Sequence, residues 1–134
     1  MIVADANLVA YFSIRTEHSA EAETVFAADS EWVSPLLWRS EFRNTLINYL
    51  RAKRMTMESV LESLQTGETA IAGREYPVDS KKVLELAHSS GCSAYDCEYV
   101  ALAMQLKVPL VTTDKQLLRA FPKVAVSLEK FAGK

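Results

Sequence analysis

The chain of 134 residues is poor in the residues on which many catalytic chemistries rest: it has two histidines, two cysteines and four glycines. Neither H-E-x-x-H nor G-x-S-x-G occurs, so hydrolysis by zinc or by a serine triad has no motif to support it. The glycine-rich phosphate motifs G-x-x-x-x-G-K-[ST] and G-x-G-x-x-G are also missing. If the protein is an enzyme, its chemistry therefore rests on carboxylates.

A long apolar run and an excess of positive charge are also lacking. The longest apolar stretch, 99–104, is far short of the roughly 20 residues that cross a bilayer. The N-terminus shows no basic segment followed by an apolar one, so we expect no signal peptide and a cytoplasmic location. Fifteen Lys and Arg against seventeen Asp and Glu give a net charge of −2, so holding a polyanion requires positive charge from another source. Cys92 and Cys97 are expected to be ordinary buried thiols.

The remaining composition is typical of one folded domain. Apolar residues make up 49% and charged residues 24%, and the chain is long enough for a single core. Short β-prone segments alternate with amphipathic helical patterns, which predicts a parallel sheet covered on both faces. The expected fold class is α/β: a single domain over 1–134, built as a three-layer α/β/α sandwich around a short-stranded, mainly parallel sheet.

The expected elements follow from hydrophobic periodicity and from capping residues. Asn7 is expected to cap the first helix, Asp79 or Ser80 the fifth and Ser93 the sixth, and Gly67 weakens the second half of the fourth. Strands are predicted at 2–5, 32–33, 77–78, 109–113 and 124–126, and helices at about 8–12, 18–29, 36–54, 56–71, 80–90, 94–106 and 116–121.

Two of the predicted strands end in an aspartate, Asp5 after the first and Asp114 after the fourth. Ligands of open parallel sheets bind beyond the carboxyl ends of the strands, so both carboxylates lie where a site is expected. Helix N-capping is the alternative interpretation for either residue alone.

Two further acids lie near the beginnings of predicted helices. Asp96 puts a carboxylate on an otherwise apolar helix face, where a lone buried charge is costly; a first-turn acid favoured by the helix dipole is the alternative. Glu41 heads a polar seam with Thr45 and Asn48, which is either the border of a cleft or a solvated flank. Four converging carboxylates would repel one another unless a cation is bound, and oxygen-only ligands select Mg²⁺ or Mn²⁺.

Two segments in the C-terminal half form a recognisable pair: Ser93-Ala-Tyr-Asp-Cys-Glu-Tyr-Val-Ala-Leu-Ala103 and Val108-Pro-Leu-Val-Thr-Thr-Asp-Lys-Gln-Leu-Leu118. They are similar to the C-terminal signature of PIN-domain nucleases. The opening Ile2-Val-Ala-Asp-Ala-Asn-Leu8 and the position of Glu41 resemble in particular the VapC-type toxins of prokaryotic toxin–antitoxin pairs. The resemblance spans the whole chain.

This resemblance implies a metal-dependent endoribonuclease. Its acidic quartet, which holds Mg²⁺ or Mn²⁺, would be Asp5, Glu41, Asp96 and Asp114. Asn7 stands where the family often has Ser or Thr and can still hydrogen-bond a ligand water. Of the two threonines before Asp114, Thr112 or Thr113 is a further supporting group, with capping as the alternative.

The resemblance also implies an RNA substrate, a homodimer and a small antitoxin whose C-terminal segment covers the acidic groove. Trp38 and Met57 are candidates for partner contacts, although core packing is the favoured interpretation of both. Basic side chains are candidates for RNA-backbone contacts, with simple solvation as the alternative: Arg51, Lys53, Arg54, Lys115 and Arg119.

Other classes fit less well. A phosphatase of the haloacid dehalogenase type needs a second acid two residues after the first, where Asn7 stands. A receiver domain needs a phosphoacceptor aspartate near mid-chain, and none lies between Asp29 and Asp79. A PIN-like module that binds without catalysing is a third possibility, against which the presence of all four acids argues.

Overall fold

The computed structural model describes residues 1–133, and its core is a five-stranded sheet in the order β3-β2-β1-β4-β5. Neighbouring strands are parallel throughout, and Val3 at the centre pairs with both Val33 and Leu110. These positions are fully buried, as expected for a parallel sheet covered on both faces. The strands are β1 (Ile2–Ala4), β2 (Trp32–Pro35), β3 (Glu75–Tyr76), β4 (Leu110–Val111) and β5 (Ala125–Val126).

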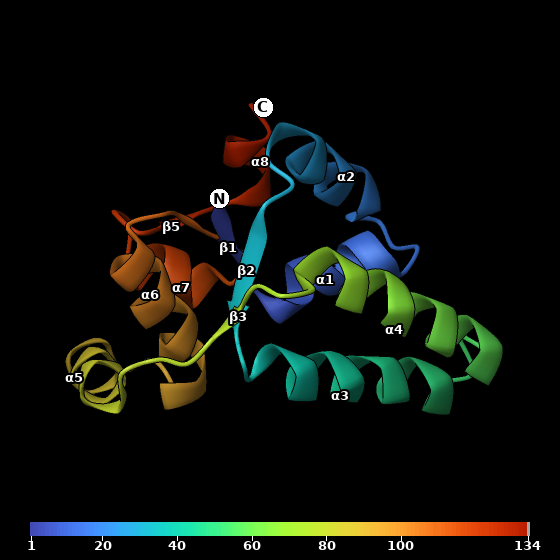
Figure 1. Cartoon of the computed structure of the whole chain (residues 1–134), viewed down its shortest axis with the longest axis horizontal. Helices are drawn as coiled ribbons and strands as arrows, with labels where there is room; N and C mark the ends of the chain where they lie inside the picture. Colours follow the sequence, from blue (N-terminus) through green and yellow to red (C-terminus); the bar gives the residue numbers. More distant parts are fainter. Residues whose placement is uncertain (134) are drawn as a thin grey trace.

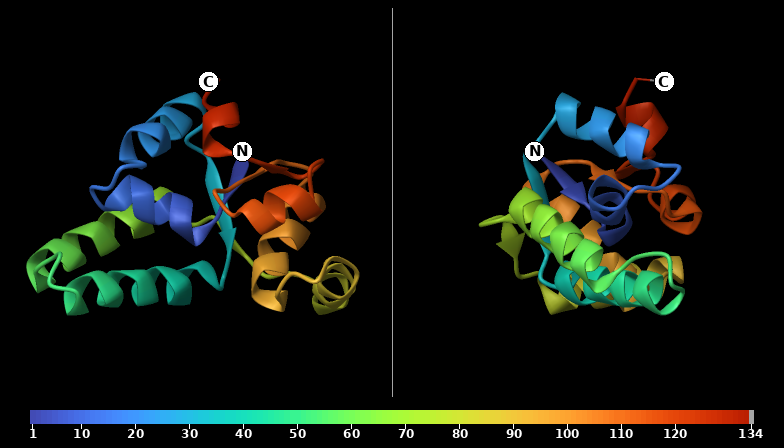
Figure 2. Two further views of the ribbon diagram at one scale, coloured as in Figure 1. Left: turned by 180° about the vertical axis from the view of Figure 1, so that it is seen from behind. Right: turned by 90° about the vertical axis from the view of Figure 1, so that its right-hand side faces the viewer.

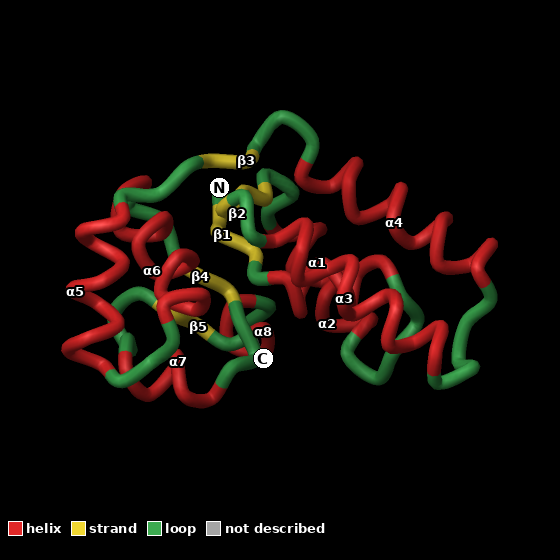
Figure 3. Tube along the Cα trace, turned by 90° about the horizontal axis from the view of Figure 1, so that it is seen from below, coloured by secondary structure: helices red, strands yellow, loops and turns green. Residues whose placement is uncertain are grey.

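Helices cover both faces of the sheet, which confirms the predicted α/β sandwich (Figures 1 and 3). Helix α6 packs on β1, β2 and β4 with α5 outside it, while α1 and α4 contact the strands from the other side, next to α2 and α3. The helices are α1 (Ala6–Ser13), α2 (Ser19–Ala28), α3 (Trp38–Arg51), α4 (Met57–Ile71), α5 (Ser80–Ser90), α6 (Ala94–Leu106), α7 (Lys115–Ala120) and α8 (Leu128–Phe131).

The helix pair α3 and α4 extends to one side of the sheet, as the views from behind and from the right-hand side show (Figure 2). Arg39 ties this pair to the sheet edge, because its guanidinium binds Glu68 of α4 and Glu75 of β3. None of the helices within residues 1–133 combines the length and the apolar character that a bilayer span needs.

Most capping predictions are confirmed, and one is wrong. Asp79 and Ser93 accept hydrogen bonds from the first turns of α5 and α6, and Gly91 ends α5 at a φ of 77°. Helix α1 is capped by Asp5 and not by Asn7, because the Asp5 carboxylate already accepts the Leu8 N–H. Asn7 therefore lies inside the first turn, with its side chain exposed.

The prediction of one strand and the omission of one helix also differ from the structure. The third strand is Glu75–Tyr76 and not 77–78. Pro77 has no N–H to donate to the ladder, so pairing ends before it. Helix α8 is missing from the prediction, because Leu128 is its only buried residue and gives no periodicity.

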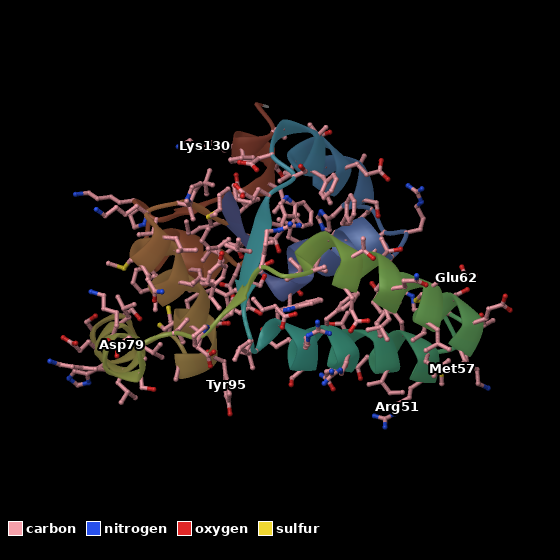
Figure 4. The ribbon with its side chains drawn as sticks, in the orientation of Figure 1. Arg51, Met57, Glu62, Asp79, Tyr95 and Lys130 are labelled. Atoms are coloured by element: carbon pink, nitrogen blue, oxygen red, sulfur yellow. The ribbon has the colours of Figure 1, made fainter. Side chains whose placement is uncertain are left out.

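Packing accounts for the remaining differences. Both cysteines are buried and unpaired, and Trp38 is fully buried, as predicted. Met57 is 53% exposed at the far end of α4, so its interpretation as a core residue is wrong (Figure 4). Gly67 lies in the middle of α4 because the helix passes against Phe42 of α3, where a Cβ would lie 2.4 Å from the ring.

Replacing Gly67 by alanine should therefore destabilise the fold, although alanine is normally the better helix former. Overpacking against Phe42 should cost about 1–3 kcal/mol in the free energy of unfolding, measured by urea denaturation. Thr66→Ala is the matched control, because Thr66 is exposed on the same helix, and it should change stability by less than about 0.5 kcal/mol. A Gly67→Ala protein as stable as wild type would contradict this packing.

Candidate active site

A small acidic pocket lies beyond the carboxyl ends of β1 and β4. Figure 3 looks onto this end of the sheet, where the first turns of α1 and α3 approach those of α6 and α7. The pocket has a volume of about 200 Å³ and all four predicted acids line it. Its lining is Asp5, Ala6, Asn7, Glu41, Asn44, Thr45, Asp96, Tyr99, Asp114 and Leu117.

Asp5 and Asp114 occupy equivalent positions on neighbouring parallel strands. Each carboxylate caps the helix that follows it, with Asp5 Oδ1 2.8 Å from the Leu8 nitrogen and Asp114 Oδ1 3.1 Å from the Leu117 nitrogen. The capping interpretation is thus correct for both residues, and both also face the pocket. Capping fixes each carboxylate at the junction between the strand and the helix that follows it.

Thr112 connects these two acids. Its hydroxyl donates to Asp5 Oδ2 and accepts the Asp114 N–H at 3.0 Å, and the side chain is fully buried. The sequence left open whether Thr112 or Thr113 supports the site. The hydrogen bonds are made by Thr112, and Thr113 is half-buried outside the pocket lining.

Glu41 and Asp96 come from the first turns of α3 and α6. Glu41 Oε1 accepts a hydrogen bond of 2.5 Å from the Tyr99 hydroxyl. Ser93 caps α6 by accepting the Asp96 N–H at 3.0 Å, which places the Asp96 side chain at the pocket end of this otherwise apolar helix. Of the seam predicted to follow Glu41, only Thr45 reaches the pocket lining.

Burial and mutual repulsion raise the pKa values of three of the acids. Burial raises the pKa of Asp5 to about 6, helped by the charges of Glu41 and Asp114 and opposed by the hydrogen bonds from Thr112 and Leu8. Burial also raises the pKa of Glu41 and Asp96, each with an added contribution from another acid of the pocket. No Lys, Arg or His is among the described residues that line the pocket. The site is therefore short of positive charge.

The chemistry of the donors suits a hard divalent cation. Every charged group of the pocket is a carboxylate, and Asn7, Asn44 and Thr45 add neutral oxygens. In the described chain, 1–133, no three His, Cys, Asp or Glu side chains are already gathered closely enough to hold an ion. The four carboxylates thus line a common pocket but lie too far apart to bind one ion together. Bringing them closer would need a cation to offset their repulsion.

Two polar lining residues are not predicted from the sequence. Tyr99 follows Asp96 by three positions and so lies on the same face of α6, a spacing that contained the necessary signal. Asn44 follows Glu41 by three positions on α3 in the same way. Both side chains are uncharged, so a search for converging charges does not find them.

The predicted basic contacts lie outside the pocket. Arg51, Lys53 and Arg54 are exposed where α3 ends, with Arg54 stacked 4.9 Å above the ring of Tyr49. Figure 4 shows Arg51 directed away from the body of the protein. Lys115 and Arg119 are exposed on α7, the helix that Asp114 caps.

Comparison with known proteins identifies the family. The model of the PIN domain family matches residues 2–124. Ribonuclease VapC3 of Pyrobaculum aerophilum is 30% identical over 124 residues, which cover 90% of this chain and 95% of that protein. The chain belongs to the PIN domain family.

Two crystal structures share the fold. PAE2754 from Pyrobaculum aerophilum superposes with a TM-score of 0.78 at 20% identity, covering 98% of this chain and 85% of that one. FitAcB from Neisseria gonorrhoeae superposes with a TM-score of 0.70 at 18% identity, covering 96% and 98%. At these identities the likeness concerns the fold alone.

The raised pKa of Asp5 predicts an unusual pH dependence of stability in EDTA. The folded state binds the Asp5 proton more tightly than the unfolded state, so stability is lost as pH rises through about 6 and regained as pH falls toward 4. Between pH 7.5 and pH 5 we expect a gain on the order of 1 kcal/mol in the free energy of unfolding, measured by urea denaturation.

Asp5→Asn is the control for this experiment, since its amide oxygen can still cap α1 but it carries no proton equilibrium in this range. The variant should lose most of the gain. Equal pH dependence in wild type and variant would show that the pH effect comes from other groups.

Proposed function

We propose that this protein is a metal-dependent endoribonuclease that hydrolyses RNA phosphodiesters, and that it is the toxin of a type II toxin–antitoxin pair. One observation carries the proposal: Asp5, Glu41, Asp96 and Asp114, from four separate helix starts, line one pocket that contains no basic side chain among the described residues. The similarity to Ribonuclease VapC3 over nearly the whole chain supports RNA as the substrate.

The four carboxylates would hold Mg²⁺ or Mn²⁺. When bound, the cation makes water more acidic and offsets the charge that builds up on the phosphate during attack. Asp5 and Asp114 are held by capping bonds and by Thr112, so their role is to keep ligand oxygens in place. Asp114 or Glu41 accepts the proton that the attacking water releases. Asn7, on the exposed side of α1, supports a ligand water.

The protein's own cations would then contact RNA away from the reacting phosphate. Arg51, Lys53 and Arg54 form one exposed basic group at the end of α3, and Lys115 and Arg119 form another on α7. Cations at such positions hold the phosphate backbone without reading sequence. Acting on cellular RNA, the protein would work in the cytoplasm.

A PIN-like module that binds RNA or protein without cleaving it is the second candidate. It is favoured because residues 1–133 contain no preformed group of side chains for an ion. The raised pKa of Asp5 weighs against it, because four partly buried acids are costly to keep together if they bind no cation. A phosphatase of the haloacid dehalogenase type has less support, since Asn7 lines the pocket where that class needs an acid.

The central test compares wild type with Asp96→Asn on structured and single-stranded RNAs, in Mn²⁺, Mg²⁺ or EDTA. Wild type should cleave only with metal, and the variant should be slower by about 100-fold or more, because one ligand charge is lost. Glu58→Gln is the matched control, because Glu58 is also an acid in the first turn of a helix but is exposed on α4 away from the pocket, and this variant should cleave normally. Cleavage that survives EDTA, or equal cleavage by wild type and Asp96→Asn, would contradict the proposal.

The proposal includes two partners. A small antitoxin would cover the acidic pocket with its C-terminal segment, and a second copy of the chain would form a homodimer. For the dimer, an apolar hollow of about 480 Å³ offers a surface, with Leu36 57% and Leu84 64% exposed at it. Exposed apolar side chains gathered in one place are a mark of protein interfaces.

Light scattering after gel filtration tests the dimer. Wild type should have the mass of two chains, and Leu84→Glu should have the mass of one, because a charge would be buried at the interface. Leu61→Glu, on α4 and 54% exposed, is the matched control and should remain dimeric. A wild-type protein with the mass of one chain at micromolar concentration would exclude this dimer.

A further inference from the structure

Tyr99 links helix α6 to the acid that α3 contributes to the pocket. Its hydroxyl donates to Glu41 Oε1 over 2.5 Å, across 58 positions of sequence. The side chain is 2% exposed and lines the same pocket as the four acids. Within residues 1–133 no other group donates a hydrogen bond to either carboxylate oxygen of Glu41.

The hydroxyl is the part of Tyr99 that packing does not require. A phenylalanine ring would fill the same space, and a buried tyrosine hydroxyl usually has a hydrogen-bond partner. That partner is here the carboxylate of Glu41.

Glu41 needs such a partner more than Asp5 and Asp114 do. The side chains of Asp5 and Asp114 are short, and each accepts a capping hydrogen bond from its own helix. Glu41 has a longer, half-buried side chain that makes no capping bond. A side chain that becomes ordered only when the ligand binds loses conformational entropy at that moment, and this loss weakens binding. A side chain that is already fixed does not have this cost.

We infer that Tyr99 is a positioning residue: its hydroxyl fixes one oxygen of Glu41 and leaves the other free for the cation in the pocket. The inference rests on the proposed function, in which Glu41 is a ligand. It assigns to Tyr99 no contact with substrate or with the ion.

The test is the Mn²⁺ affinity of Tyr99→Phe, measured by the paramagnetic resonance signal of free Mn²⁺ without RNA. We expect binding about 10- to 100-fold weaker than in wild type, the usual effect of removing a hydrogen-bond partner of a metal ligand. Tyr95→Phe is the matched control, because Tyr95 lies one turn earlier on α6 and is 65% exposed, and it should bind like wild type.

A double-mutant cycle separates positioning from a general loss of structure. If Tyr99 acts through Glu41, then Tyr99→Phe should weaken Mn²⁺ binding in wild type and have no further effect in Glu41→Gln. An equal loss in both backgrounds would overturn the inference. Urea denaturation checks folding, and a partly unfolded variant is titrated again in trimethylamine N-oxide, which favours the compact state without replacing the hydroxyl.

The outcomes distinguish this inference from the proposed function. Wild type that binds Mn²⁺ while Asp96→Asn does not, with Tyr99→Phe unchanged, overturns the inference alone. Wild type that binds no Mn²⁺ overturns both.

Discussion

Repulsion among four carboxylates in one partly buried pocket is the constraint on which this structure depends. The fold meets it by placing every acid at the start of a helix: Asp5 and Asp114 at N-caps, Glu41 and Asp96 in first turns. The positive end of a helix dipole favours each charge by about 0.3–1 kcal/mol, and more where it is partly buried. The pKa of Asp5 is nevertheless raised, first by burial and then by the charges of Glu41 and Asp114. The remaining deficit of positive charge is what makes the pocket suited to a cation.

The parallel sheet brings the N-termini of these helices close together. Because β1 and β4 are neighbours that run in the same direction, the helices that follow both of them begin at one edge. Helix α6 packs across the same strands, and α3 begins just beyond the end of β2. Thr112 then joins Asp5 to Asp114 by hydrogen bonds, and Tyr99 donates a hydrogen bond to Glu41. The fold thus sets the positions of the acids, and the hydroxyls of Thr112 and Tyr99 orient their carboxylates.

How far the sequence predicts this arrangement depends on the range of the interactions involved. Local signals predict the caps of α5 and α6 and the succession of strands and helices along the chain, because both depend on residues close in the sequence. The convergence of four acids could be expected only from the resemblance, because it depends on strand order. Propensity alone makes Gly67 a weak point of α4, and only its contact with Phe42 explains the glycine. The spacing of Tyr99 places it on the helix face of Asp96, but only the fold brings its hydroxyl to Glu41, 58 positions away in the sequence.

Anomalous diffraction from a crystal grown with Mn²⁺ tests the central claim most directly, since it locates the ion without assuming any activity. We expect a strong anomalous peak within about 2.5 Å of carboxylate oxygens from at least three of Asp5, Glu41, Asp96 and Asp114. The carboxylates should lie closer together there than in the metal-free protein. An ordered acidic pocket with no peak, or a peak only at other sites, would contradict the account.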